Sequence, residues 1–232
     1  MNAVYNYLND FLSLFFPDLC CGCGINLVSN ESTICTNCTF HLPYTNYYKE
    51  PDNRVARQFW GRVPFIHCSA FLHFRKGSKV QNLMHQLKYN NKTDVGLKLG
   101  QMYGDQLLRA FESSKPDLII PVPLHKAKEK KRGYNQSSFF AEGLAIALDI
   151  PVDSSSLQRN TFTDSQTRKS RFNRYENMQE VFAVAIPDTL EGKHVLLVDD
   201  IITTGATIES CAKALLAIPK VQLSIAAIAF TD

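Results

Sequence analysis

The amino-acid sequence predicts an α/β fold with an open, mostly parallel central sheet. From residue 65 to the C-terminus, short apolar runs alternate with longer segments whose apolar residues recur at helical spacing. The apolar runs are nearly continuous, which is typical of strands covered by helices on both faces. Strands that alternate with helices in this way form parallel sheets, and ligands bind such sheets beyond the carboxyl ends of the strands.

The first 19 residues predict an amphipathic helix that docks on the rest of the protein. Their apolar residues recur at helical spacing: Leu8, Phe11, Leu12, Phe15, Phe16 and Leu19. No basic segment or small-residue cleavage site marks a signal peptide, and no apolar run approaches the ~18 residues that span a bilayer. A helix on a membrane surface is the alternative, but such helices usually carry lysines on the polar face. We therefore expect a cytoplasmic protein with no membrane insertion.

The cysteines predict a metal site near the N-terminus. Cys20 with Cys23 and Cys35 with Cys38 form two CxxC pairs, separated by eleven residues. Two such pairs place four thiolates around one tetrahedral Zn²⁺ ion, and a site with four protein ligands is structural. Redox-active cysteines and simply buried cysteines are the alternatives. Cys21 has no assigned role.

We divide the chain into residues 1–50, an N-terminal helix with a small zinc-ribbon-like module, and residues 51–232, the α/β domain. The stretch 41–64 has little periodicity and predicts a linker or a wrapping arm. The 232 residues are 45% hydrophobic and 20% charged, which argues against disorder. A net charge of +3 permits an anionic substrate, but a dedicated nucleic-acid-binding domain would be much more basic.

The elements of the α/β domain follow in order along the chain. Strands are predicted at 66–74, 117–123, 194–201 and 222–230. Helices are predicted at 78–89, 94–111, 137–150 and 208–217. Ser78 is placed to cap the first of these helices, because its hydroxyl can accept a hydrogen bond from a free N–H of the first turn.

The segment 195–207, VLLVDDIITTGAT, predicts a phosphate site at the end of a strand. A turn rich in hydroxyl groups precedes a helix, and the free N–H groups at a helix N-terminus bind phosphate. A glycine in the turn lets the backbone approach the ligand closely. The candidate phosphate-binding residues are Thr203, Thr204, Gly205, Ala206 and Thr207. An ordinary strand that ends in a turn with a threonine cap is the alternative interpretation.

Asp199 and Asp200, at the end of the same predicted strand, are the candidate catalytic residues. Carboxylates accept hydrogen bonds and repel phosphate, so they do not belong to the phosphate site itself. We expect them to accept hydrogen bonds from sugar hydroxyls or to help hold Mg²⁺. This order of groups along the chain suits a ribose phosphate.

The segment 121–137, PVPLHKAKEKKRGYNQS, directly follows another predicted strand and predicts a loop rich in cations, such as pyrophosphate would need. The candidate pyrophosphate-binding residues here are Pro123, Lys126, Arg132, Gly133, Asn135 and Gln136. A solvated basic face is the alternative, and for the lysines alone it is the better interpretation.

These motifs carry a family resemblance. The segment 195–207 closely resembles the 5-phosphoribosyl-1-pyrophosphate (PRPP) motif of type I phosphoribosyltransferases. PVPLH followed by RGYNQ, and LKY at 87–89, match the pattern of the ComF family, named for bacterial competence for DNA uptake. Five further residues fit its downstream pattern: Arg159, Gln166, Arg174, Asn177 and Phe182. With the CxxC pairs included, the resemblance covers nearly the whole chain.

The resemblance implies a type I phosphoribosyltransferase-like fold and an enzyme that binds PRPP and Mg²⁺. Such an enzyme transfers the phosphoribosyl group to an acceptor and releases pyrophosphate. The segment between Arg159 and Phe182 corresponds to the mobile loop of type I enzymes, and the resemblance implies that Arg174 there binds pyrophosphate. One departure from the family pattern is Arg168-Lys169, where the family often has Gly-Leu.

Two other functions stay open at this point. A DNA-uptake factor would bind single-stranded DNA through basic segments such as 126–132, with Tyr134 available for stacking on bases. A sugar-phosphate sensor would bind PRPP without turnover. The sequence identifies neither the acceptor nor the catalytic base, and it leaves a homo-oligomer as one option.

Overall fold

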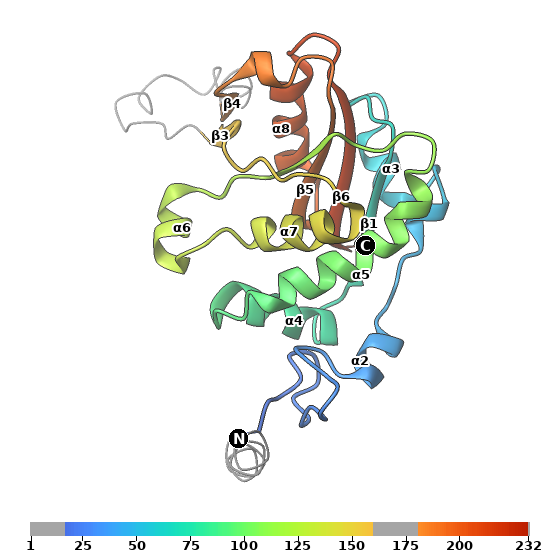
Figure 1. Cartoon of the computed structure of the whole chain (residues 1–232), viewed down its shortest axis with the longest axis vertical. Coiled ribbons are helices and arrows are strands. Elements are labelled where there is room, and N and C mark those ends of the chain that lie inside the picture. The colour runs from blue at the N-terminus through green and yellow to red at the C-terminus, as the bar shows by residue number, and fades with distance from the viewer. Residues whose placement is uncertain (1–16, 160–180, 232) are drawn as a thin grey trace, which may run out of the picture.

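The computed structural model describes residues 17–159 and 181–231, and its main sheet is parallel (Figure 1). The strands of this sheet are β1 (Cys68–Phe74), β2 (Leu118–Pro121), β5 (His194–Ile202) and β6 (Gln222–Thr231). Their order across the sheet is β1-β6-β5-β2, and every neighbouring pair is parallel. The predicted fold class is confirmed, and each strand coincides with an apolar run of the sequence.

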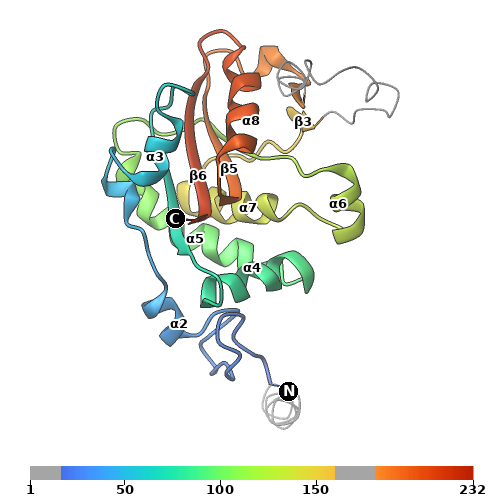
Figure 2. The same ribbon diagram turned by 180° about the vertical axis from the view of Figure 1, so that it is seen from behind.

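Helices cover both faces of the sheet (Figures 1 and 2). One face is covered by α4 (Lys79–Tyr89), α5 (Asp94–Ala110) and α7 (Gln136–Leu148). The other is covered by α3 (Arg54–Phe59) and α8 (Ala206–Leu216). Along β5, Leu196 and Val198 belong to the first core, and Val195 and Leu197 belong to the second. The sheet therefore separates two cores, which explains why its strands are apolar on both faces.

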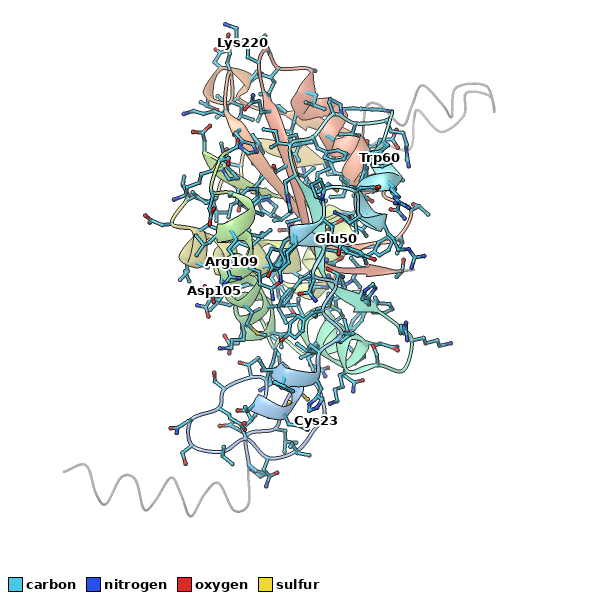
Figure 3. All side chains as sticks on the ribbon, turned by 90° about the vertical axis from the view of Figure 1, so that its right-hand side faces the viewer. Cys23, Glu50, Trp60, Asp105, Arg109 and Lys220 are labelled. Carbon is cyan, nitrogen blue, oxygen red and sulfur yellow. The ribbon has the colours of Figure 1, made fainter. Side chains whose placement is uncertain are left out.

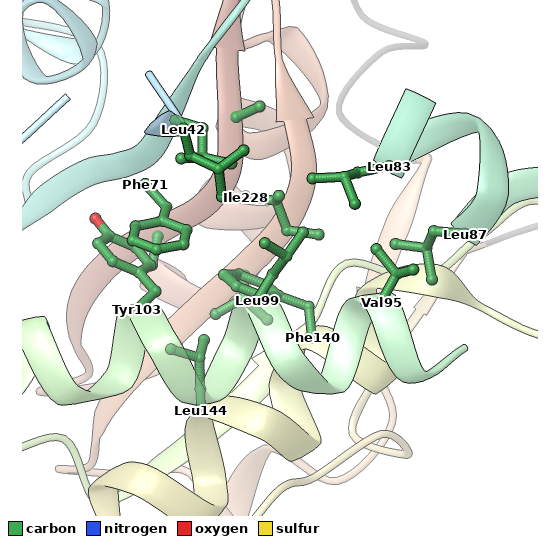
Figure 4. Close-up of a cluster of buried hydrophobic side chains, with 14 of the residues drawn as sticks. Leu42, Phe71, Leu83, Leu87, Val95, Leu99, Tyr103, Phe140, Leu144 and Ile228 are labelled. Carbon is green, nitrogen blue, oxygen red and sulfur yellow. The ribbon is translucent and has the colours of Figure 1, made fainter. Parts of the chain in front are cut away.

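The helices α5 and α7 cross with their backbones in contact. A Cβ atom on Gly143 would lie 2.1 Å from the carbonyl oxygen of Leu97, and a Cβ atom on Gly100 would lie 2.4 Å from that of Phe140. Glycine at both positions permits this approach, because any larger side chain would push the helices apart. Figure 4 shows the core around the crossing, which includes Phe140 and Tyr103. This packing fixes α7, and its first turn reaches the candidate site.

The stretch 41–64 is more ordered than the linker that the sequence predicts, because it contains η1 (Tyr47–Lys49) and α3. The side-chain oxygen of Asn53 accepts hydrogen bonds from the N–H groups of Val55 and Ala56, at 3.0 and 2.9 Å. The amide of Asn53 donates to the carbonyl of Cys68 at 2.8 Å and so ties the helix to β1. A helix of six residues is too short for its periodicity to stand out in the sequence.

The basic segment after β2 forms a helix, α6 (Lys126–Arg132), in place of the predicted loop. The side chain of His125 caps its first turn by accepting a hydrogen bond from the N–H of Ala127 at 3.2 Å. Gly133 ends it with a φ of 87°, which glycine adopts at no steric cost. The cations at 126–132 are therefore spread around a helix, and they do not all face the same ligand.

Two short strands lie outside the main sheet. They are β3 (Leu157–Arg159) and β4 (Phe182–Val184), which pair antiparallel. Arg159 lies opposite Phe182 in the register, and its guanidinium carbon is 5.3 Å from the centroid of that ring. These are the first and last residues of the downstream family pattern. The short helix η4 (Pro187–Thr189) then leads to β5.

The N-terminal region contains the short helix α2 (Thr36–His41) and lies beside α4, at the far end of the molecule from Lys220 (Figures 1 and 3). The side-chain amide of Asn82 in α4 donates to the carbonyl of Gly22 at 2.9 Å. The helix predicted within residues 1–19 lies almost wholly outside the described residues, and the domain boundary at residue 50 stays a prediction. Within 17–159 and 181–231, no helix has the length and apolar character needed to cross a membrane.

Candidate functional site

The two predicted catalytic aspartates lie at the carboxyl end of β5, where Asp200 is at the centre of a polar network. Asp200 is only 7% exposed. Its Oδ2 accepts a hydrogen bond from Gln136 Nε2 at 2.6 Å and pairs with Lys88 Nζ at 2.8 Å. Arg132 in turn donates to the side-chain oxygen of Gln136. The predicted residues Arg132, Gln136 and Asp200 are thus brought together, and Lys88 joins them from α4.

Asp199 lies in a different environment from its neighbour. Its Oδ1 accepts hydrogen bonds from the backbone N–H of Asp200 at 2.8 Å and from Ser137 Oγ at 3.2 Å. Burial of the carboxyl, together with the adjacent charge of Asp200, raises the pKa of Asp199 to about 7, although these hydrogen bonds oppose the shift. A carboxyl with a pKa near neutrality changes its charge under ordinary conditions. Such perturbed groups gather at functional sites.

The predicted phosphate loop connects β5 to α8. Thr203 and Thr204 are exposed, and Gly205 adopts a φ of 74° immediately before the first residue of α8, Ala206. Gly205, at the N-cap position, makes no side-chain hydrogen bond to this helix, and only a long contact of 3.5 Å joins the N–H of Ala206 to Thr204 Oγ1. A cavity of about 30 Å³ is lined by Asp199 and residues 201–208, including Thr207. The loop therefore has hydroxyl donors beside a helix N-terminus, which is the combination that a phosphate needs.

The helix α3 supports this loop from the other side, and the sequence did not reveal that contact. Gln58 Nε2 donates to the carbonyl oxygen of Thr203 at 3.0 Å. The ring of Phe59 lies against Gly205, where an added Cβ atom would be 2.8 Å from two ring atoms. Glycine is thus favoured at position 205 for two independent reasons, its positive φ and its close approach to Phe59. The Asn53 cap followed by apolar residues at 55, 56 and 59 is the signal that could have located this helix.

A cleft of about 430 Å³ lies beyond the end of β2, next to β5 in the sheet. Three predicted pyrophosphate residues line it: Pro123, Lys126 and Asn135. The Asn135 side chain donates to the carbonyl of Val122 at 2.9 Å and accepts from the N–H of Ser137, which fixes the start of α7. Arg132 and Gly133 do not line this cleft, and Arg174 lies outside the described residues. The predicted pyrophosphate set is therefore divided between the cleft and the far end of α6.

The four predicted zinc ligands form one cluster. The Sγ atoms of Cys20, Cys23, Cys35 and Cys38 all lie within 4.8 Å of one another, and Cys23 Sγ is 3.8 Å from Cys35 Sγ. Zn–S bonds of ~2.3 Å in a tetrahedron place the sulfur atoms about 3.8 Å apart, so the cluster can bind one zinc ion. Burial raises the pKa of the Cys35 and Cys38 thiols, so a cation is needed for all four to be thiolates.

Comparisons with known proteins identify a family domain and several relatives. The phosphoribosyl transferase domain family matches residues 135–231. The protein named DNA utilization protein YhgH of Escherichia coli O157:H7 is 32% identical over 213 residues, covering 88% of this chain and 87% of that protein. Competence protein F of Haemophilus influenzae is 27% identical over 217 residues, covering 87% of this chain and 92% of that protein.

Other similarities are partial. The match to DNA utilization protein YhgH of Salmonella typhi is 33% identical over 137 residues, and it covers 58% of this chain and 60% of that relative's length. A solved structure of a purine phosphoribosyltransferase from Pyrococcus horikoshii Ot3 is 22% identical with a TM-score of 0.39, covering 58% of this chain and 73% of that one. On the near full-length match to the E. coli protein and the phosphoribosyl transferase domain, the chain belongs to the ComF family of phosphoribosyltransferase-like proteins.

Proposed function

We propose that this protein binds PRPP with Mg²⁺ and transfers the phosphoribosyl group to an acceptor, releasing pyrophosphate. One juxtaposition carries the proposal. The aspartate pair and the loop around Gly205 follow β5, while the cleft with Lys126 follows the neighbouring strand β2. Groups suited to a phosphate, a ribose and a pyrophosphate therefore lie along one edge of a parallel sheet, at the strand ends where such sheets bind ligands.

The residues take separate roles in this proposal. The 5-phosphate binds the N–H groups and hydroxyls of Thr203 to Thr207, and the ribose hydroxyls donate to Asp199 and Asp200. Pyrophosphate binds in the cleft near Lys126. The family resemblance assigns Arg174 to the same group, and this residue lies outside the described residues. Asp199 and Asp200 also fit as ligands for Mg²⁺, which usually takes one or two carboxylates together with substrate phosphates. When bound, Mg²⁺ supplies charge that stabilises pyrophosphate as it leaves.

The chemistry needs no covalent intermediate with the protein. The bond from C1 of the ribose to the pyrophosphate oxygen breaks, its electron pair leaves with pyrophosphate, and the acceptor forms a new bond to C1. Positive charge develops on the ribose ring during this exchange, and in this proposal the carboxylates of Asp199 and Asp200 stabilise it. Lys88 and Gln136 hold Asp200 in place, and Ser137 holds Asp199, so the site needs little rearrangement.

Pyrophosphate release tests this function. The unaltered chain, incubated with PRPP, Mg²⁺ and a panel of candidate bases, should release pyrophosphate with at least one of them. Asp200→Asn should lower turnover at least tenfold, about 1.4 kcal/mol. Binding of PRPP without any release would instead identify a sensor. An equal rate in Asp200→Asn would contradict the role of the aspartate pair.

We further propose that the cysteine cluster holds a structural zinc ion and that the protein works in the cytoplasm. All seven cysteines are free, and the four clustered thiols bind zinc only when a reducing compartment keeps them from forming disulfides. Residues 1–50 would then form a module that metal binding stabilises, attached to the phosphoribosyltransferase-like domain at 51–232.

Handling of single-stranded DNA is a second candidate function. Relatives named competence protein F and DNA utilization protein YhgH favour it, and so do the cations of α6. Oligonucleotide binding should then weaken steeply as salt is raised, because phosphate contacts release counterions. Negligible binding at low salt, with and without PRPP, would exclude this function.

A further inference from the structure

A second cavity, of about 390 Å³, lies between the C-terminal ends of α4 and α6. Four cations and two tyrosines account for most of its lining: Lys88, Lys128, Lys131, Arg132, Tyr89 and Tyr134. No carboxylate of the described residues lines it, whereas Glu129 lines the cleft after β2. The volume is near the small end of the ~300–1,000 Å³ range of ligand pockets, so it suits one small unit.

The cations of this cavity are of two kinds. Lys88 is held by its ion pair with Asp200, and Arg132 is held by its hydrogen bond to Gln136. Lys128 and Lys131 project from the exposed helix α6, and neither forms an ion pair with a carboxylate in the described ranges. Unpaired cations beside fixed ones favour an anion, and phosphate offers several oxygens to accept their hydrogen bonds.

The two tyrosines provide a flat wall. Tyr134 donates its hydroxyl to the carbonyl of Leu87, and its ring meets Phe139 edge-on with centroids 5.6 Å apart, so it is fixed. Tyr89 is 69% exposed, and the guanidinium carbon of Arg132 lies 5.6 Å from its ring centroid. An exposed ring beside a guanidinium and lysines is the arrangement on which bases of nucleic acids stack.

We propose that this cavity binds a nucleotide, with its base stacked on Tyr89 and its phosphate held by Lys128 and Lys131. An inorganic anion alone would make no use of the exposed ring, and an uncharged aromatic compound would make no use of the lysines. A free mononucleotide and one unit of single-stranded DNA present the same base and phosphate, so both are sources of this ligand. The cavity adjoins the proposed PRPP site, because Lys88 lines it and pairs with Asp200, and because Arg132, which the sequence assigns to pyrophosphate, also lines it. As a site for DNA, it rests on the second candidate function above.

The test uses the full chain and 2′-deoxyadenosine 3′-monophosphate as the probe. This nucleotide has no 5′-phosphate and therefore does not resemble a phosphoribosyltransferase product. Calorimetry at low salt should detect binding to the unaltered chain. Tyr89→Ala should weaken it about tenfold, the order expected for one lost stacking contact, and Lys131→Gln should weaken it at least threefold. Lys130→Gln is the matched control, because Lys130 is the neighbouring residue on α6 and does not line the cavity.

The outcomes separate the alternatives. A single-stranded dA₈ oligomer that binds much more tightly than the probe, with the same losses in Tyr89→Ala and Lys131→Gln, would support the cavity and identify DNA as the source. Equal affinity for probe and oligomer would support a free nucleotide. No binding, or equal losses in Lys130→Gln and Lys131→Gln, would overturn the proposal. PRPP binding is measured in a separate titration. A failure to bind PRPP would count against the proposed transferase and not against this cavity.

Discussion

Replacing Gly205 with alanine perturbs the phosphate loop by two effects that the structure separates. The φ of 74° lies in the left-handed region, which costs an alanine roughly 1–2 kcal/mol. The new Cβ atom would also lie 2.8 Å from two atoms of the Phe59 ring, which is fully buried. Overpacking of this kind costs about 1–3 kcal/mol. The total expected loss of unfolding free energy is therefore about 2–5 kcal/mol.

Gly77 provides a matched control for the strain of the left-handed backbone conformation. Its φ is 78°, and an added Cβ atom would meet nothing within 4 Å. Gly77→Ala should therefore lose only about 1–2 kcal/mol, the strain of the left-handed conformation. Urea denaturation of both variants measures the difference, which isolates the contact with Phe59. In the double variant Gly205→Ala with Phe59→Leu, the smaller side chain at position 59 should relieve part of the overlap that Gly205→Ala creates in the loop.

The same variants test the function of the loop. If the turn at Gly205 presents N–H groups to a phosphate, Gly205→Ala should weaken PRPP binding at least tenfold under conditions where the protein stays folded. Gly77→Ala should leave PRPP binding unchanged, because Gly77 lies before α4 and lines none of the three cavities. Normal PRPP affinity in folded Gly205→Ala, or an equal loss in Gly77→Ala, would refute this reasoning.

Three further predictions concern the zinc cluster, the carboxyl with a raised pKa and the helix crossing. Cys38→Ser should lose the zinc ion and several degrees of Tm, and a chelator should have the same effect on the unaltered chain. Elemental analysis should still find one zinc per chain in Cys21→Ser. Asp199 is protonated below its pKa of about 7, so PRPP affinity should fall about tenfold in total as pH drops from 8 to 6. If Asp199→Asn keeps the same pH dependence, the titrating group belongs to PRPP and not to Asp199. Gly143→Ala should lower unfolding free energy by at least about 2 kcal/mol, because the Cβ atom would lie 2.1 Å from a carbonyl oxygen of α5; an unchanged urea midpoint would contradict it.

The sequence predicts well those features that depend on local patterns. The helix capped by Ser78 begins and ends as expected, and its buried residues are the four that recur at helical spacing: Val80, Leu83, Met84 and Leu87. The aspartate pair and the phosphate loop are contiguous in the chain, so one strand, one turn and one helix suffice to bring them together. The four cysteines are predictable for a similar reason, since each CxxC pair already has chelating spacing.

Contacts between distant segments are not visible in such patterns. Gln58 and Thr203 are 145 residues apart, and nothing in either segment indicates that α3 supports the phosphate loop. In the sequence, Lys88 stands out only as part of a family signature, yet its ammonium group pairs with Asp200. The strands β3 and β4 have three residues each, too few for an alternating pattern to be recognised. Only the assembled sheet brings these groups to the site.

Calorimetric titration of PRPP, with and without Mg²⁺, measures whether the strand ends of the sheet bind this ligand. We expect the unaltered chain to bind PRPP more tightly when Mg²⁺ is present. Asp200→Asn should weaken this binding at least tenfold, because it removes the charge proposed to bind the ribose and leaves Lys88 unpaired. Asp105→Asn, at an exposed position of α5, should bind PRPP as the unaltered chain does. No PRPP binding in the presence of Mg²⁺, or equal affinity in Asp200→Asn, would contradict the account.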